Sequence, residues 1–192
     1  THEGEEEMAL EAHRRVLESI PDALLMLVPR HPERFQSVAT LLRKAGFEFV
    51  RRTSGEACTE DASIFLGDTM GELPLFYAAS DVAFVGGSLV PVGGHNLLEP
   101  GALGLPVITG PHLYNTEEIA KLFRDIGASK IVSDPRELAD AVVPLLSNPD
   151  AAKAMGRKGR QVVTTNRGAL KRLMVLLKPL VSEGREAGRS AR

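Results

Sequence analysis

Short, mostly apolar runs alternate with amphipathic stretches along most of this chain. The runs are typical of strands buried in a parallel sheet, and they lie at residues 24–28, 48–51, 63–66, 81–85, 106–109 and 129–132. Between them, apolar residues recur with helical spacing and predict helices at 5–20, 32–45, 72–79, 96–103, 116–125 and 136–146, with one or two more within 150–180. In the first helix, Met8, Ala12, Val16 and Ile20 share one face, which we expect to be buried.

This alternation predicts an α/β fold, with a Rossmann-like parallel sheet and helices on both faces. In such sheets, ligands bind beyond the carboxyl ends of the strands. Four segments follow strands and should therefore meet at one edge, namely residues 29–31, 67–72, 86–99 and 110–115. Four converging segments favour a binding site there over a plain packed domain.

Composition narrows the class of protein. The 192 residues are 43% hydrophobic, enough for one well-cored domain, and the net charge of −2 gives no global field to recruit nucleic acid. One cysteine, Cys58, allows no internal disulfide. No apolar run approaches the roughly 20 residues that span a bilayer. We expect one domain at residues 1–180, followed by a small basic tail at 181–192.

The glycine-rich segment 84–100 reads FVGGSLVPVGGHNLLEP and has the means to hold a phosphate. Its glycines allow a ligand close to the backbone, and Asn96 is a good cap for a helix whose free N–H groups attract anions. Glu99 lies one helical turn after Asn96, where its carboxylate can accept hydrogen bonds from ribose hydroxyls. The segment matches neither the Walker A pattern nor GxGxxG. By itself, it could equally be a tight turn whose glycines only satisfy packing.

At these residues the chain resembles the C-terminal half of a GT-B glycosyltransferase, and more narrowly 3-deoxy-D-manno-octulosonic acid (Kdo) transferases. The matching stretches follow the family's order and spacing over most of the first 130 residues. They read THEGEEE at the start, VPRHPERF at 28–35, GDTMGELPLFYAASDVAFVGGSL at 67–89 and GGHNLLEPGALGLPVITGPHLYN at 93–115.

The resemblance implies CMP-Kdo as donor and a lipid A precursor as acceptor in lipopolysaccharide core biosynthesis. It also implies that CMP is bound by three segments, comprising Pro29, Arg30, Met70, Gly71, Glu72, Asn96, Leu97, Leu98 and Glu99. Possible further donor contacts are Gly87, Ser88, Gly94 and His95. The residue chemistry agrees, because the Arg30 guanidinium can bind a phosphate with two hydrogen bonds and Gly71 leaves its backbone open to a base edge.

Several of these residues have a structural alternative. Arg30 could pair with Glu33 or Glu72, and Glu72 could simply be the first-turn acid of its helix. His31 and His95 could be hydrogen-bonded structural residues, although His95 is the better candidate for a substrate contact. We expect Asp68 and Asp81 to be turn and strand-edge residues.

We expect transfer without a metal or other cofactor, because the sequence has no Asp-x-Asp pair and no metal-ligand spacing. The resembled family places its catalytic base in an N-terminal acceptor domain, and nothing in this sequence matches that domain. Thr1–Gly4 resembles the loop after the first strand of the C-terminal domain. We therefore expect a fragment that lacks the acceptor domain and is inactive alone.

The family works at the cytoplasmic face of the bacterial inner membrane, with membrane contact mainly through the N-terminal half. Basic residues of the last helices could add attraction to anionic lipid, although a solvated helix face is the simpler interpretation. They are Arg157, Lys158, Arg160, Arg167, Lys171 and Arg172. Two alternatives for the function remain open: another GT-B enzyme, such as a UDP-sugar transferase or epimerase, and a noncatalytic nucleotide-binding module.

Overall fold

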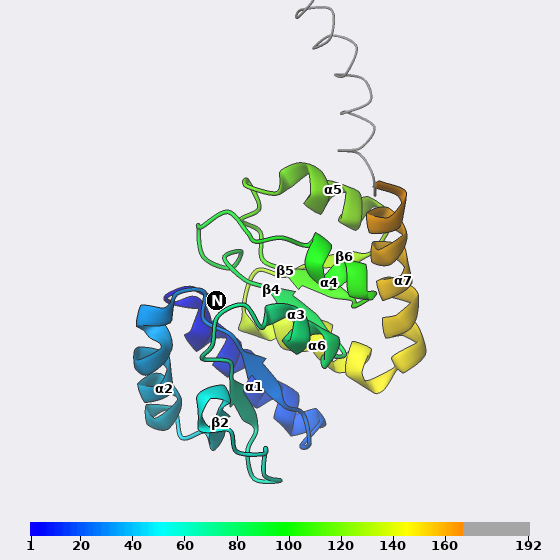
Figure 1. Cartoon of the computed structure of the whole chain (residues 1–192). Helices are drawn as coiled ribbons and strands as arrows, with labels where there is room; N and C mark the ends of the chain where they lie inside the picture. The colour runs from blue at the N-terminus through cyan, green and yellow to red at the C-terminus, as the bar shows by residue number, and fades with distance from the viewer. Residues whose placement is uncertain (167–192) are drawn as a thin grey trace, which may run out of the picture.

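The computed structural model describes residues 1–166 and contains every strand and helix expected in that range (Figure 1). The strands are β1 (Leu25–Leu27), β2 (Phe49–Arg51), β3 (Ile64–Leu66), β4 (Ala83–Val85), β5 (Val107–Thr109) and β6 (Ser129–Ile131). The helices are α1 (Glu5–Ser19), α2 (Phe35–Lys44), α3 (Leu73–Ala78), α4 (Leu98–Leu103), α5 (Glu117–Asp125), α6 (Pro135–Ser147) and α7 (Pro149–Asn166). Short 3-10 turns η1 (Pro32–Arg34) and η2 (Arg52–Ser54) follow β1 and β2.

The strands form two parallel sheets of three strands each, in the orders β1-β3-β2 and β4-β5-β6. The predicted parallel α/β class is confirmed, but two sheets replace the one sheet that alternation suggests. The chain start lies beside the end of β1: the Thr1 amino group donates to the Val28 carbonyl at 2.8 Å, and the Arg30 amide donates to the Thr1 carbonyl at 3.1 Å.

Helix α1 buries two faces in two different cores. The predicted face is confirmed, because Ala12 and Val16 are buried with side chains of β5 and α6. Ala9 and Leu10 are buried in the other core, among side chains of β1, β3 and α2. Because both sheets bury apolar surface against this helix, α1 fixes them relative to each other. Figure 1 shows α2 at one end of the molecule and α7 at the other.

Helix α4 is held against α7 by a close approach of glycine backbones. A Cβ on Gly156 would lie 1.7 Å from the Gly104 carbonyl oxygen, and one on Gly101 would lie 2.7 Å from the Phe123 ring. Only glycine fits at such contacts. The short α4 therefore begins at a fixed place, next to the glycine-rich segment.

Three expectations fall wholly or partly beyond the described residues. The predicted continuation of the last helix towards 180, the domain boundary at 180 and the basic tail 181–192 lie outside residues 1–166. Within the described range, none of the helices has the length and apolar character needed to cross a bilayer.

Candidate functional site

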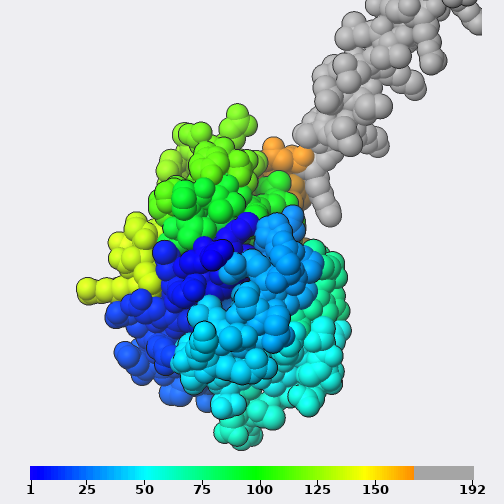
Figure 2. Space-filling view, turned by 90° about the vertical axis from the view of Figure 1, so that its left-hand side faces the viewer, coloured from blue at the N-terminus to red at the C-terminus, as the bar shows by residue number. Residues whose placement is uncertain are grey.

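The segments after β4 and β5 are joined by hydrogen bonds at the carboxyl edge of the second sheet. The Gly94 amide donates to the Gly87 carbonyl at 2.7 Å, and the His112 amide donates to the Ser88 carbonyl at 3.0 Å. The buried Ser88 hydroxyl accepts from the Gly110 amide at 2.7 Å. Residues 86–89 thus connect the segments that lie at this edge of the sheet. Figure 2 shows the chain start (dark blue) at the surface between the green segment and the paler blue segment.

The buried carboxylate of Glu5 accepts hydrogen bonds from backbone amides at and just after the first glycine pair. Glu5 accepts from the amides of Gly87 at 2.8 Å and of Ser88 and Leu89 at 3.1 Å each, and from His2 at 3.3 Å. The pattern of glycines predicts an anion at this loop, and the structure places a carboxylate of the protein there. The amides of Gly87 and Ser88, which we expected only as possible further donor contacts, are therefore already bonded within the protein.

Glycine at position 86 makes room for that carboxylate. A Cβ on Gly86 would lie 2.6 Å from a Glu5 carboxylate oxygen, too close for any side chain. Glu5 lies in the first turn of α1, where the sequence alone suggests only an acid that complements the helix dipole. The signal that could have revealed it is Glu5 itself, an acid at the position where the helix enters the core.

Three histidines gather beside Gly87. The Nε2 atoms of His2 and His95 lie 2.7 Å apart, with the rings stacked at a centroid distance of 4.9 Å. The His31 ring meets His2 edge-on at 5.5 Å. Gly87 has φ +69°, and a Cβ there would lie 3.1 Å from His95 Nε2, so its lack of a side chain admits the pair.

The His95 imidazole is held neutral. Burial, followed by the neighbouring charges of His2, the Thr1 amino group and Arg30, lowers the pKa of His95 to about 4. Burial likewise lowers the pKa of His2. Arg30 is exposed, and its charge acts on His95, so the structure brings these two predicted residues together. Pro29, which was also predicted to bind CMP, is buried.

The start of α4 presents two polar side chains on one face, as predicted. The Asn96 amide group donates to the Glu99 carboxylate at 3.1 Å, while the Asn96 carbonyl oxygen accepts from the Leu98 amide at 3.0 Å. The helix begins at Leu98 rather than Asn96, and Leu97, not the predicted Asn96, occupies the N-cap position without a side-chain capping bond. Leu97 is only 1% exposed, so it can offer a ligand nothing but backbone.

The segment after β3 approaches this helix. Met70 is 56% exposed, and Gly71 has φ +83° with open space around its Cα. Burial, followed by the charge of Glu99, raises the pKa of Tyr77 to about 12, which places the face of α3 near Glu99. The predicted residues of segments 70–72 and 96–99 thus lie on neighbouring elements.

Glu72 is already paired. Its carboxylate accepts from the Thr69 hydroxyl at 2.5 Å and from Arg52 at 2.9 Å, and these two hydrogen bonds lower the pKa of Glu72. Glu33 lies 3.8 Å from His31. Arg30 therefore pairs with neither of the acids considered from sequence, and within residues 1–166 it forms no ion pair.

Asp68 has the structural role expected of a turn residue. It is buried and accepts from the Thr53 amide at 2.9 Å, from the Thr53 hydroxyl at 2.6 Å and from Arg51 Nε at 2.7 Å. Burial acts to raise the pKa of Asp68, but these hydrogen bonds outweigh it and hold the pKa below its usual value. Asp68 thereby ties η2 to the end of β3.

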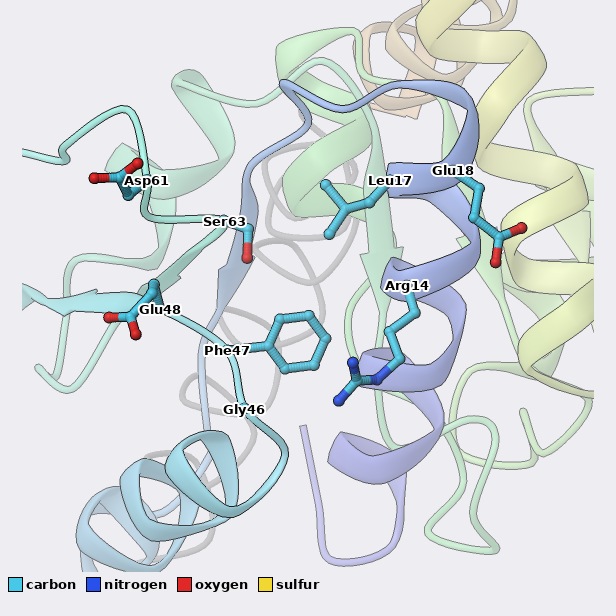
Figure 3. A pocket seen from close by; sticks show the side chains of 8 residues that line it. All are labelled: Arg14, Leu17, Glu18, Gly46, Phe47, Glu48, Asp61 and Ser63. Atoms are coloured by element: carbon cyan, nitrogen blue, oxygen red, sulfur yellow. The ribbon is translucent and has the colours of Figure 1, made fainter.

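The larger surface depression lies at the opposite edge of the first sheet. It has a volume of about 520 Å³, and Arg14 and Leu17 of α1 face Phe47 across it, next to Ser63 (Figure 3). Phe47 precedes β2 and Ser63 precedes β3, so the depression lies at the amino ends of the strands. A smaller one, of about 280 Å³, lies between α1 and α6. Neither is lined by a residue predicted to bind nucleotide.

The described part of the chain contains no group of three or more His, Cys, Asp and Glu side chains arranged to hold a metal ion. The two facing imidazole nitrogens form a hydrogen bond instead.

A family model and the sequences of known proteins both identify relatives among the glycosyltransferases. The family model described as "Glycosyl transferases group 1" matches residues 3–162. A 3-deoxy-D-manno-octulosonic acid transferase of Haemophilus influenzae is 49% identical over 180 residues, covering 93% of this chain and 42% of the relative. One of Bordetella pertussis is 40% identical over 181 residues, covering 91% of this chain and 42% of the relative.

A solved structure is similar over most of the chain. It is described as the C-terminal CMP-Kdo binding domain of WaaA from Acinetobacter baumannii, with 38% identity, a TM-score of 0.81 and 85% of each chain covered. The chain thus spans 42% of the length of the two curated relatives and matches the separate domain over most of its length.

Proposed function

This chain belongs to the glycosyl transferases group 1 family, and we propose that it binds CMP-Kdo as the donor domain of a Kdo transferase. The observation that carries the proposal is the exposed Arg30, which forms no ion pair within residues 1–166 and whose charge acts on His95, in the loop that leads into α4. The related domain described as CMP-Kdo binding, at 38% identity, supports the choice of nucleotide.

The donor phosphate bears the charge of the leaving group as the bond to the sugar breaks. Arg30 and the backbone amides of Asn96 and Leu97 stabilise that charge, since the Leu98 amide is taken by Asn96. A fixed cation and amides supply this stabilisation without a metal or other cofactor. Glu99 accepts hydrogen bonds from the ribose hydroxyls, displacing the side-chain amide of Asn96.

The base is read by main-chain groups of Met70 and Gly71, where no Cβ obstructs the approach. Glu72 fixes this segment through its hydrogen bonds with Thr69 and Arg52. The exposed Met70 side chain can cover one face of the ring.

The rest of the reaction requires groups outside this chain. We propose that the acceptor is a lipid A precursor, that its hydroxyl is deprotonated by a carboxylate of a separate acceptor domain, and that this domain contacts the cytoplasmic face of the inner membrane. The named relatives, which are more than twice as long as the matched region, support such a second domain. This chain alone should bind CMP and transfer no Kdo.

Calorimetry with CMP and UDP tests the proposal. We expect CMP to bind more tightly than UDP, and Arg30→Ala to weaken CMP by about 1.5–3 kcal/mol, the value of a hydrogen bond to a charged group. Arg15→Ala is the matched control, because Arg15 lies on the far side of α1 and pairs with Glu11. Equal affinities for CMP and UDP, or an unchanged affinity in Arg30→Ala, would reject the nucleotide assignment.

A further inference from the structure

Two facing imidazole nitrogens can hold only one hydrogen atom between them. His2 Nε2 and His95 Nε2 are 2.7 Å apart, so one ring donates and the other accepts. Protonating both rings would place two N–H groups against each other and break the contact. The pair can therefore exist as two neutral rings, or as one imidazolium bonded to one imidazole. Within residues 1–166, the Nδ1 atom of neither ring has a hydrogen-bond partner, which leaves both for a ligand.

The surroundings of the pair fix it in place and leave it open to an anion. Gly87 packs beneath both rings, and Glu5 lies under that loop with its carboxylate satisfied by four backbone amides. The other charged or titratable groups that act on the pair are the Thr1 amino group, Arg30, His31 and Arg34. Arg34 is itself paired with Glu6 at 3.0 Å. Among the groups within residues 1–166 that act on the two rings, Glu5 is thus the one acid, its carboxylate is already bound by backbone amides, and the other groups are basic.

The chemistry of the proposed donor demands a second anion site next to the phosphate. An octulosonic acid is a keto sugar acid, so its anomeric carbon carries both the carboxylate and the bond to the nucleotide phosphate. A domain that holds the phosphate at Arg30 must accommodate the carboxylate within a few bond lengths. His95 lies close enough to Arg30 for the guanidinium charge to act on the imidazole.

We propose that the His2–His95 pair binds the carboxylate of the donor sugar and takes up one proton as it does so. This inference rests on the proposed function, and it adds how the sugar acid is recognised. The proton comes from solvent and converts the neutral pair into an imidazolium bonded to an imidazole, with no covalent bond formed or broken. A neutral sugar on the same nucleotide would leave the pair uncharged, so the pair selects acidic sugars.

NMR-monitored pH titration of the histidine rings tests this in the intact chain. With saturating CMP-Kdo, the titration midpoint of the pair should rise by about one to three pH units, as for a group that gains an opposite charge within 4–6 Å. CMP alone should raise it much less. CMP is the stringent control, because its terminal phosphate carries more charge than the phosphate diester in CMP-Kdo. An equal rise with both ligands would overturn the carboxylate assignment.

Calorimetry provides a second, variant-independent measurement. At pH 7, CMP-Kdo binding measured in two buffers of different ionisation enthalpy should show net uptake of a fraction of a proton, as expected for a titration midpoint that rises towards 7, whereas CMP binding should show no net uptake. If both ligands bind without proton uptake, the inference fails while the proposed function stands. If neither ligand binds, both fail.

A pair of variants locates the effect. His95→Gln should abolish proton uptake and weaken CMP-Kdo at least tenfold while leaving CMP affinity unchanged. His31→Gln is the control, because His31 contacts only the edge of His2 and lies half exposed at the surface. Proton uptake that persists in His95→Gln, or is lost in His31→Gln, would overturn the assignment to this pair.

Discussion

At the scale of single residues, one buried acid determines what the glycine-rich segment can do. Glu5 is fully buried, yet its charge is balanced by four backbone N–H groups rather than by a cation. Backbone amides directed at one point form an anion site, and here the protein supplies the anion. Residues 86–89 therefore have a structural role. Ligand binding is assigned to Arg30, the histidine pair and the start of α4.

Replacing this acid tests its role directly. Glu5→Gln should lower the free energy of unfolding by about 2–3 kcal/mol, because the glutamine NH₂ group would face amides that need an acceptor. Glu7→Gln, an exposed position on the same helix, should change it by less than about 0.5 kcal/mol. Urea unfolding of both variants gives the comparison. Equal stability of the two variants would contradict the role assigned to Glu5.

Glu99 allows a sharper test of ligand orientation. Glu99→Gln should weaken CMP by about 1.5–3 kcal/mol, through loss of hydrogen bonds between ribose hydroxyls and a charged acceptor. The same variant should have little effect on 2′,3′-dideoxy-CMP, which lacks those hydroxyls. Calorimetry on the two ligands measures the difference, and equal losses would remove the ribose from this position.

At the scale of elements, what could be predicted from the sequence is what depends on local spacing. The helical face of α1 and the Asn96–Glu99 contact follow from residues three or four apart, so periodicity alone reveals them. The Glu5 hydrogen bonds join residues 82 to 84 positions apart, and the His2–His95 contact joins residues 93 apart. Contacts between residues so far apart in the sequence cannot be predicted from local spacing. The partners came together only because α1 packs between two sheets, an arrangement that alternation of strands and helices does not predict.

The contact between α4 and α7 determines where the start of α4 lies. Gly156→Ala should lower the free energy of unfolding by about 1–3 kcal/mol, as expected for overpacking a close backbone contact with Gly104. Gly159→Ala is the matched control on the same helix, since its Cβ would meet a Phe123 ring atom at 3.3 Å and alanine favours the helix by about 1 kcal/mol.

Chemical denaturation should therefore rank Gly156→Ala as the less stable of the two variants. If Gly156→Ala also weakens CMP binding, α7 holds α4 in position for the ligand. If Gly159→Ala is instead the less stable variant, the packing of α4 against α7 does not depend on the contact between Gly156 and Gly104.

At the scale of the whole molecule, two separate cores share one helix. The first core lies under β1, β3 and β2, the second under β4, β5 and β6, and α1 contributes side chains to both. The hydrogen bonds of Glu5 and the histidine pair bridge the same division near the carboxyl edges of the strands. His13, in the middle of α1, joins the helix to the first sheet, where its Nε2 lies 2.9 Å from the Ser63 carbonyl. The three histidines whose pKa values are lowered by burial thus lie on α1 or in segments close to its start.

This placement makes the stability of the molecule sensitive to mild acid. Burial lowers the pKa of His13, His2 and His95, the last to about 4, against an ordinary value of 6.5. The unfolded chain therefore binds protons more readily than the folded chain below pH 6.5. The part of the free energy of unfolding that depends on these neutral imidazoles is fully present above pH 6.5. It is lost as the pH falls towards 4. The lowered pKa values of Asp68 and Glu72 act in the same direction, but only at lower pH, where carboxylates titrate.

Urea unfolding at pH 8, 7, 6 and 5 measures this dependence. The free energy of unfolding should fall steadily from pH 7 to pH 5. His95→Gln should flatten the fall, because glutamine takes up no proton, whereas His31→Gln at the surface should leave it unchanged. A free energy that stays level or rises between pH 7 and 5 would show that these imidazoles are not held neutral by the fold. Saturating CMP-Kdo should also flatten the fall, because a pair that is protonated in the complex no longer opposes folding in mild acid.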